Sequence, residues 1–202
     1  MNKCFEEMCT TMKYIQKENA EIKAENACLT SECTLLKKRV LEAELRIVQL
    51  DQYSRNKNLE IKGVPTSQSE NLSAILKKIG DVVSEPISEN DVEICHRVPT
   101  RDSGQSNIVV QFRSRSKRDA VLNKTRKKRL SATDLGYTQS CAVFVNEHLC
   151  SELKKLLGMT IARKREKNWR FAWTRDGKIF ARKSESCRSL QIMHVSDLEK
   201  ID

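Results

Sequence analysis

An apolar residue recurs every seven positions from Met8 to Leu50, and this repeat constrains the fold of the 202-residue chain more than any other feature. A seven-residue apolar repeat that continues over six heptads is typical of a left-handed coiled coil. We therefore predict one long helix over residues 8–50, within an oligomerisation segment of residues 1–52. The residues predicted to line the seam between copies are Ile15, Asn19, Ile22, Asn26, Leu29, Leu36, Val40, Ile47 and Leu50.

The seam carries two signals about the assembly. Asn19 and Asn26 occupy consecutive a positions, where buried amides specify register at a cost in stability. Arg39 and Glu44 flank Val40 in a pattern that resembles a parallel trimer motif, so we favour a trimer over a dimer. The alternative is a single amphipathic helix docked on its own domain, but residues 8–50 would span about 65 Å, too long for a small body.

Positive charge is concentrated in one part of the chain, which has a net charge of +10 overall. Residues 96–183 hold 22 Lys and Arg against 7 Asp and Glu, a net charge of +15. A domain-sized segment with this charge favours a polyanionic partner, of which nucleic acid is the commonest. A basic surface that serves only solubility is the alternative.

Residues 53–146 follow the element order β-α-β-β-α-β, which is typical of the split βαβ sandwich of RNA-recognition motifs and of unrelated domains. Strands are predicted over 58–64, 91–98, 107–113 and 141–145, helices over 69–83 and 116–129, and a loop with Gly104 over 100–106. Strand alternation predicts that Ile94 and His96 point inward. The exposed sheet positions would then be Lys62, Arg97, Gln111 and Arg113, which favours phosphate contacts over base stacking.

Residues 147–202 are predicted to form a small basic domain. A helix is predicted over 147–167, and Asp176-Gly177 between two strand-like runs is a strong hairpin signal. Residues 190–193 are predicted to add a third strand, and Ser196 to cap a short final helix. The predicted fold class is therefore α+β, with a coiled-coil helix, an RNA-recognition-motif-like sandwich and a small C-terminal domain.

Several classes of function are disfavoured. The sequence has no glycine-rich phosphate loop, paired acidic site or nucleophile elbow, so we predict no enzyme, cofactor or small-molecule substrate. The spacing of the eight cysteines does not fit a zinc site, so no metal is predicted. No apolar run reaches about 18 residues and no secretory signal is apparent, which favours no membrane contact and a cytoplasmic location. A nuclear location is the alternative, because residues 124–129 are basic enough for a localisation signal.

Basic runs next to tryptophans are the candidate binding residues. The runs over 124–129 and 163–167 end predicted helices, and the second leads into Trp169 and Trp173. Aromatic rings stack on bases while cations contact phosphates. The candidate nucleic-acid-binding residues are Arg55, Lys57, Arg97, Arg113, Lys117, Arg118, Arg126, Lys127, Lys128, Arg129, Arg163, Arg165, Lys167, Trp169, Arg170 and Trp173.

Several blocks resemble known families. Three blocks are similar to blocks of the first-open-reading-frame proteins of non-LTR retrotransposons: LDQYSRNKNLEIKGVP, EICHRV and IVVQFRSRSKRDAVL. Three later blocks resemble the baculovirus few-polyhedra (FP) protein family: VFVNEHLC, LKKLL and ARKREKNWRFAWTRDGKIFARK. The first resemblance implies a trimeric, RNA-packaging chaperone that uses the family's basic positions Arg55, Arg97, Arg113, Lys117, Arg118 and Arg126. No endonuclease or reverse transcriptase block is present, so autonomous transposition is not implied.

These observations together predict a homo-oligomeric, sequence-tolerant binder of single-stranded RNA or DNA that prefers RNA. The oligomer would contribute avidity by presenting several basic bodies to one strand. The alternative is a viral or domesticated structural adaptor that acts through coiled-coil contacts with proteins.

Overall fold

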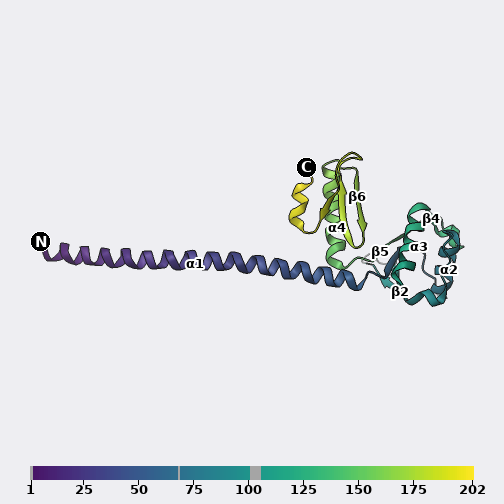
Figure 1. Cartoon of the computed structure of the whole chain (residues 1–202), viewed down its shortest axis with the longest axis horizontal. Helices are drawn as coiled ribbons and strands as arrows, with labels where there is room; N and C mark the ends of the chain where they lie inside the picture. Colours follow the sequence, from purple (N-terminus) through teal and green to yellow (C-terminus); the bar gives the residue numbers. More distant parts are fainter. Residues whose placement is uncertain (1, 68, 101–105) are drawn as a thin grey trace. The chain divides into compact units, whose positions relative to one another are not determined.

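The computed structural model describes residues 2–67, 69–100 and 106–202, so residues 101–105 of the predicted loop, with Gly104, lie outside the described residues. The chain is mixed α+β, with a long N-terminal helix and antiparallel sheets (Figure 1). It divides into two compact units, Met1–Ile47 and Val48–Asp202. The finer division predicted at residues 52 and 146 stays a prediction.

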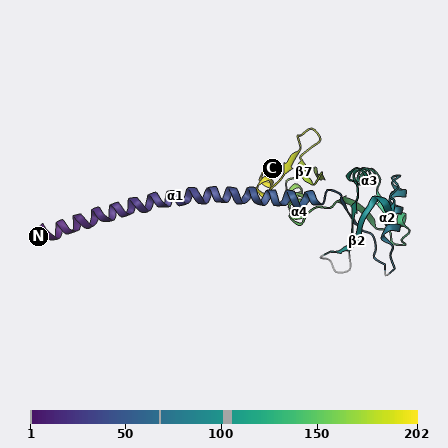
Figure 2. The ribbon, with the colours of Figure 1, turned by 60° about the horizontal axis from the view of Figure 1, so that its bottom comes forward.

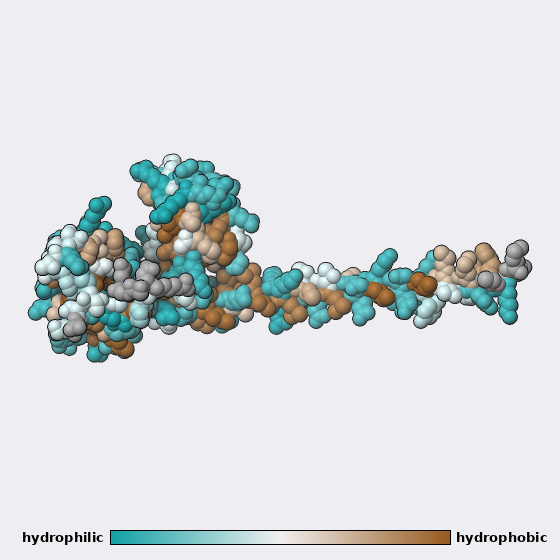
Figure 3. Space-filling model, turned by 180° about the vertical axis from the view of Figure 1, so that it is seen from behind, coloured by the Kyte–Doolittle hydropathy of each residue, from teal (hydrophilic) through white to brown (hydrophobic). Residues whose placement is uncertain are grey.

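The N-terminal helix α1 runs from Asn2 to Ser54 (Figure 2). The nine predicted seam residues all lie on it and are all exposed in the single chain. Leu29 and Leu36, for example, are 51% and 47% exposed. Hydrophobic side chains recur along the helix between hydrophilic ones (Figure 3).

The first sheet has the strand order β2-β3-β1-β5-β4, and all of its neighbours are antiparallel. Its strands are β1 Asn58–Lys62, β2 Val92–Pro99, β3 Ser106–Phe112, β4 Leu130–Ser131 and β5 Ala142–Glu147. The helices of this part are α2 Leu72–Val82, α3 Arg115–Lys127 and the short 3-10 helices η1 Glu89–Asp91 and η2 Ala132–Leu135. The prediction missed β4 and η2, because two residues of strand and one helical turn are too short to show a period.

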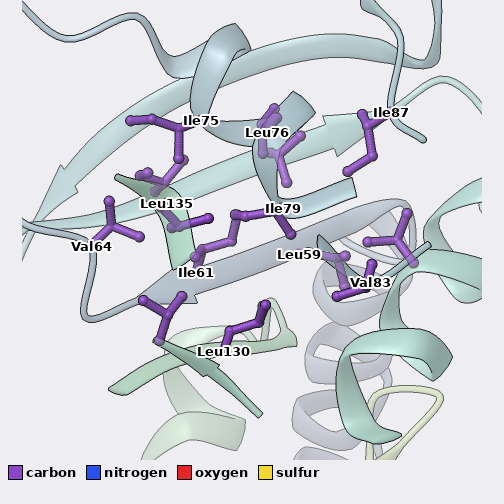
Figure 4. Close-up of a cluster of buried hydrophobic side chains, with 14 of the residues drawn as sticks. Leu59, Ile61, Val64, Ile75, Leu76, Ile79, Val83, Ile87, Leu130 and Leu135 are labelled. Carbon is purple, nitrogen blue, oxygen red and sulfur yellow. The ribbon is translucent and has the colours of Figure 1, made fainter. Parts of the chain in front are cut away.

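Alternate residues of the strands form the core of this part. Ile108, Val110 and Phe112 of β3 are fully buried, as their alternation predicts. Leu59 and Ile61 of β1 lie beside the apolar face of α2 (Figure 4). The helix α2 begins three residues later than predicted, because the Asn71 side chain accepts a hydrogen bond from the Ala74 amide and caps it.

Strand β2 corrects one prediction. Its register shifts between Val92 and Ile94, which inserts one extra residue and reverses the alternation beyond it. Ile94 and His96 are therefore exposed, whereas Cys95 packs against the core and Arg97 is half-buried. The prediction that Ile94 and His96 point inward and Arg97 outward is wrong.

The C-terminal part has its own sheet and hydrophobic cluster. The elements are α4 Ser151–Glu166, β6 Phe171–Arg175, β7 Lys178–Arg182, β8 Leu190–Ile192 and the 3-10 helix η3 Val195–Lys200, with strand order β6-β7-β8. The predicted hairpin is confirmed: Asp176 and Gly177 both have positive φ, 52° and 70°, as a tight two-residue turn requires. The residues buried in the cluster are Leu149, Cys150, Leu153, Leu156, Ile179, Ala181, Ile192 and Ile201.

Two predicted boundaries in this part are wrong. The helix does not begin at Glu147, which instead ends β5 and pairs with Leu59 of β1. The final helix is capped by His194 rather than Ser196: the His194 side chain accepts from the Ser196 amide, and the Asp197 carboxylate accepts from the His194 amide. The cap needs an acceptor before the first turn, and histidine is a rare choice for it.

Gln52 ties the end of α1 to the chain that follows β5. Its side-chain amide donates to the His148 carbonyl at 3.1 Å and accepts from the Cys150 amide at 2.9 Å. A side chain at Gly177 would place Cβ 2.6 Å from Gln52, so the hairpin turn also closes against it. Burial of Gln52 is compatible with stability because both ends of its amide are satisfied.

His148, beside this tie, makes folding sensitive to acid. Burial, together with the positive charge of Lys154, lowers the pKa of His148 from 6.5 to about 4. Between about pH 6.5 and pH 4 the unfolded chain therefore binds a proton that the folded chain does not, and stability is lost as the pH falls. Thermal melts at pH 7, 5.5 and 4.5 should show a steeper loss for the wild type than for His148→Gln. Equal pH dependence of both proteins would contradict this expectation.

Candidate nucleic-acid interface

The outer face of the C-terminal sheet carries aromatic and cationic side chains next to one another. Residues of one face, such as Ile179 and Ala181, are fully buried in the hydrophobic cluster. Cross-strand partners share a face, so the other face holds the remaining residues of the β6–β7 hairpin. These form three successive pairs: Phe171 with Arg182, Trp173 with Phe180, and Arg175 with Lys178.

The rings and guanidinium groups of this face contact one another. The rings of Trp173 and Phe180 stack with centroids 5.7 Å apart at an interplanar angle of 20°. The Arg182 guanidinium carbon lies 4.8 Å from the Phe171 centroid and 5.9 Å from that of Trp173. Arg170 approaches Phe171 to 5.2 Å. Cation–π attraction of this kind holds planar groups in a row without neutralising their charge.

The end of the hairpin carries an uncompensated pair of cations. Arg175 and Lys178 lie directly opposite each other and are both exposed. Within the part of the chain that the structure describes, neither side chain has an ion-pair partner. Like charges directly opposite each other destabilise a strand pair, and an anion between them would relieve the repulsion.

Helix α3 adds positive charge beside the hairpin. Arg126 donates from its guanidinium to the Thr174 carbonyl at 3.0 Å, and Arg115 pairs with Asp176 at 3.1 Å. Lys127 and Arg129 follow at the exposed end of α3. Of the predicted contacts, Arg126 thus lies against β6 at Thr174, the residue after Trp173.

Other predicted contacts are engaged within the fold. Arg97 pairs with Glu70 at 2.6 Å and donates to three backbone carbonyls, so it is not an exposed sheet residue. Arg118, whose side chain is 3% exposed, contacts Asp119 at 2.5 Å and Glu147 at 3.7 Å. The sequence of the basic helix gives no sign that Arg118 is buried, because the other cations of that helix are mostly exposed. Both arginines are corrected to structural residues and leave the candidate interface.

The remaining predicted contacts lie in several places. Ion pairs hold Lys117 to Glu85 at 2.6 Å, Arg55 to Asp51 at 3.0 Å, Arg163 to Glu166 at 2.8 Å and Arg170 to Glu185 at 3.1 Å. Trp169 donates to the Asp202 carbonyl at 2.7 Å, and Lys128 to the Val82 carbonyl at 2.6 Å. Lys57, Arg113 and Arg165 are exposed, and Lys167 is half-buried.

One group of residues has the composition of a metal site. Ligand atoms of Asp51, Cys150 and Glu152 lie within 4.8 Å of one another. Arg55 already provides a cation there, through its ion pair with Asp51. The N-terminus of α4 adds partial positive charge beside Glu152, which disfavours a metal cation. We therefore assign no metal to this group.

The comparisons with known proteins concern the same C-terminal part. Residues 150–202, which contain α4 and the whole β6-β7-β8 sheet, match the family model described as Baculovirus FP protein domain 2. The predicted resemblance of this part to the FP family is thereby confirmed. No curated protein matches the chain, and the resemblance to retrotransposon proteins stays an expectation. Among the described helices, none is long and apolar enough to cross a membrane.

Proposed function

We propose that the chain is a homo-oligomeric, sequence-tolerant binder of single-stranded nucleic acid, and that it grips the strand with the outer face of the β6-β7-β8 sheet. The observation that supports this proposal most directly is the series of three cross-strand pairs, which places three rings and three cations on one face. Arg175 and Lys178 are suited to phosphates, and the guanidinium and ring planes behind them to bases. Neither kind of contact distinguishes one base from another, so little sequence preference is expected.

The exposed stripe of α1 supports the oligomeric part of the proposal. Half-exposed apolar residues at a and d positions, such as Leu29 and Leu36, recur along one side of the helix. Joining copies through this stripe would present several hairpins to one strand. Linked sites of this kind raise overall affinity by about 10²–10⁴-fold without any new contact.

The strand order of the first sheet supports the proposal that this part is an RNA-recognition-motif-like sandwich. Its strand order, β2-β3-β1-β5, is the order in which the four strands of that sandwich lie, and both helices cover one face. We propose RNA as the preferred strand on the resemblance of this part to retrotransposon RNA-packaging proteins. Competition between RNA and DNA oligonucleotides of one sequence tests that preference.

The cations at the hairpin end provide the direct test. Replacing Arg175 and Lys178 by alanine should weaken binding to all sequences alike and flatten the log–log salt dependence. The slope for single strands is about −0.7 per neutralised phosphate, so the change should reach about 1.4 if both engage. Affinities for a labelled 20-nucleotide RNA at several salt concentrations measure it.

The matched control removes the same charge elsewhere. Lys13 and Lys77 are exposed lysines of α1 and α2, and their double alanine variant should keep the wild-type slope. If Arg175→Ala/Lys178→Ala retains both affinity and slope, the hairpin face is not the interface. If the wild-type protein binds neither RNA nor DNA, the function as a whole is refuted, and the exposed stripe of α1 then favours the structural adaptor.

A further inference from the structure

The two faces of the first sheet differ, and one is not covered by α2 and α3. Leu59, Ile61, Ile108 and Val110 point to the helices and are buried. By strand alternation the open face carries the residues between them. Its members are Ile94, His96 and Val98 of β2, Asn107, Val109 and Gln111 of β3, Asn58, Glu60 and Lys62 of β1, and Phe144 and Asn146 of β5.

At the centre of the open face, charged and polar side chains contact one another. Glu60 is 5% exposed, and its carboxylate accepts from Lys154 at 3.0 Å and from Asn107 at 2.9 Å. Burial opposes ionisation of Glu60, but the hydrogen bond and charge of Lys154 and the charge of Lys62 hold its pKa below the usual value. The charges at the centre of the face are therefore largely balanced, and the exposed side chains around the centre are the ones available to a ligand.

Phe144 stands out on this face. Its side chain is 58% exposed, and its cross-strand partner is Lys62, whose side chain is 48% exposed. The other exposed apolar residues of the face, Ile94 and Val98, lie on β2, three strands away in the order β2-β3-β1-β5. At about 4.8 Å per strand the separation is roughly 14 Å. Phe144 is therefore a single exposed ring among polar side chains and not part of an apolar patch that a protein partner would need.

We infer that Phe144 is a stacking platform for one unpaired base of the bound strand, with Lys62 beside it for the adjoining phosphate. This inference rests on the proposed function and adds a second contact to it. An exposed ring next to a half-exposed lysine fits a nucleotide, because every base has a face for the ring and every nucleotide has one negative charge. Lys62 is held only loosely, 3.8 Å from the Glu60 carboxylate, so its ammonium stays accessible to a phosphate. Asn146, exposed on the same strand and face, adds an amide within the same polar surroundings.

The test compares three replacements of Phe144 in the full-length protein, with a labelled uridine 20-mer as the probe. Phe144→Ala and Phe144→Leu should both lower the affinity about 5- to 150-fold, the range for loss of one stacked base. Phe144→Trp should keep or raise it, because it retains an aromatic face. The salt slope should stay at its wild-type value in all three, since no phosphate contact is removed.

Ile94→Ala on the same face is the matched control and should bind like the wild type. Thermal melts should be nearly unchanged for all four variants, because both side chains are more than half exposed. If Phe144→Leu binds like the wild type while Phe144→Ala does not, the contact is apolar packing and the inference is overturned. It is also overturned if Phe144→Ala alters the oligomer mass instead of the affinity.

The outcome separates this inference from the proposed function. A wild-type protein that binds the strand, loses slope on replacement of Arg175 and Lys178, and tolerates every change at Phe144 would keep the function and refute the platform. A wild-type protein that does not bind the 20-mer would refute both.

Discussion

Replacing Leu29 and Leu36 by aspartate should turn the protein into a monomer and weaken its binding to a long single strand by about 10²–10⁴-fold. Both leucines occupy d positions and are about half exposed on α1 of the single chain. In an oligomer they would be buried, and an unpaired carboxylate in such a seam costs several kcal/mol. The helix itself should persist, because both side chains are about half exposed in the single chain.

The control moves the same change to another side of the helix. Leu35 and Leu41 occupy c and b positions and are 57% and 38% exposed. Leu35→Asp/Leu41→Asp should therefore keep the wild-type mass in sedimentation equilibrium, whereas Leu29→Asp/Leu36→Asp should not. A wild-type protein that sediments as a monomer at micromolar concentration would refute the coiled coil. Equal dissociation of both variants would refute the heptad assignment.

A short oligonucleotide separates avidity from direct contact. A 20-mer that engages one body should bind the Leu29→Asp/Leu36→Asp monomer about as well as it binds one site of the wild type. A strand several times longer should discriminate between them, because only the oligomer can hold it at several points. Loss of affinity for both lengths would indicate that the substitutions damage the binding body itself.

Helices and strands that follow one repeat over many residues were predictable from the sequence. The helix α1 and the inner residues of β3 follow repeats of 3.5 and 2 residues that continue without interruption. The hairpin was equally predictable, because Asp176-Gly177 supplies the positive φ angles that the turn needs. Counting outward from that turn pairs Trp173 with Phe180 and Arg175 with Lys178. The residues of the outer face could therefore also be predicted from the position of the turn.

Features that depend on contacts across the fold were not predictable. The bulge between Val92 and Ile94 leaves no mark in the sequence, yet it exchanges the two faces of β2 and turns Arg97 inward. Arg118 lies in a basic helix among exposed cations, and only the fold brings Glu147 to it. Charge density along the chain therefore did not separate the structural arginines of the basic region from its exposed ones.

Glu147→Ala should lower the free energy of unfolding by about 3 kcal/mol, at the lower end of the range for breaking a buried ion pair. The Glu147 carboxylate accepts from the amides of Asp176 and Gly177 at 2.9 and 3.2 Å and lies 3.7 Å from the Arg118 guanidinium. Removing it leaves two turn amides without their acceptor and one buried cation with Asp119 alone. Urea denaturation measures the loss.

Two further variants separate the charge of Glu147 from its hydrogen bonds. Glu147→Gln keeps an acceptor for the turn but loses the charge, so its destabilisation should be smaller than that of Glu147→Ala. Arg118→Leu/Glu147→Leu removes both buried charges and should lose less stability than the sum of the losses of Arg118→Leu and Glu147→Leu, because neither charge is left unpaired. Additive losses in this cycle would show that the two residues do not interact. Because Glu147 ends β5 and holds the β6–β7 turn, its loss should also speed hydrogen exchange of the Gly177 amide while the interior of β3 stays protected.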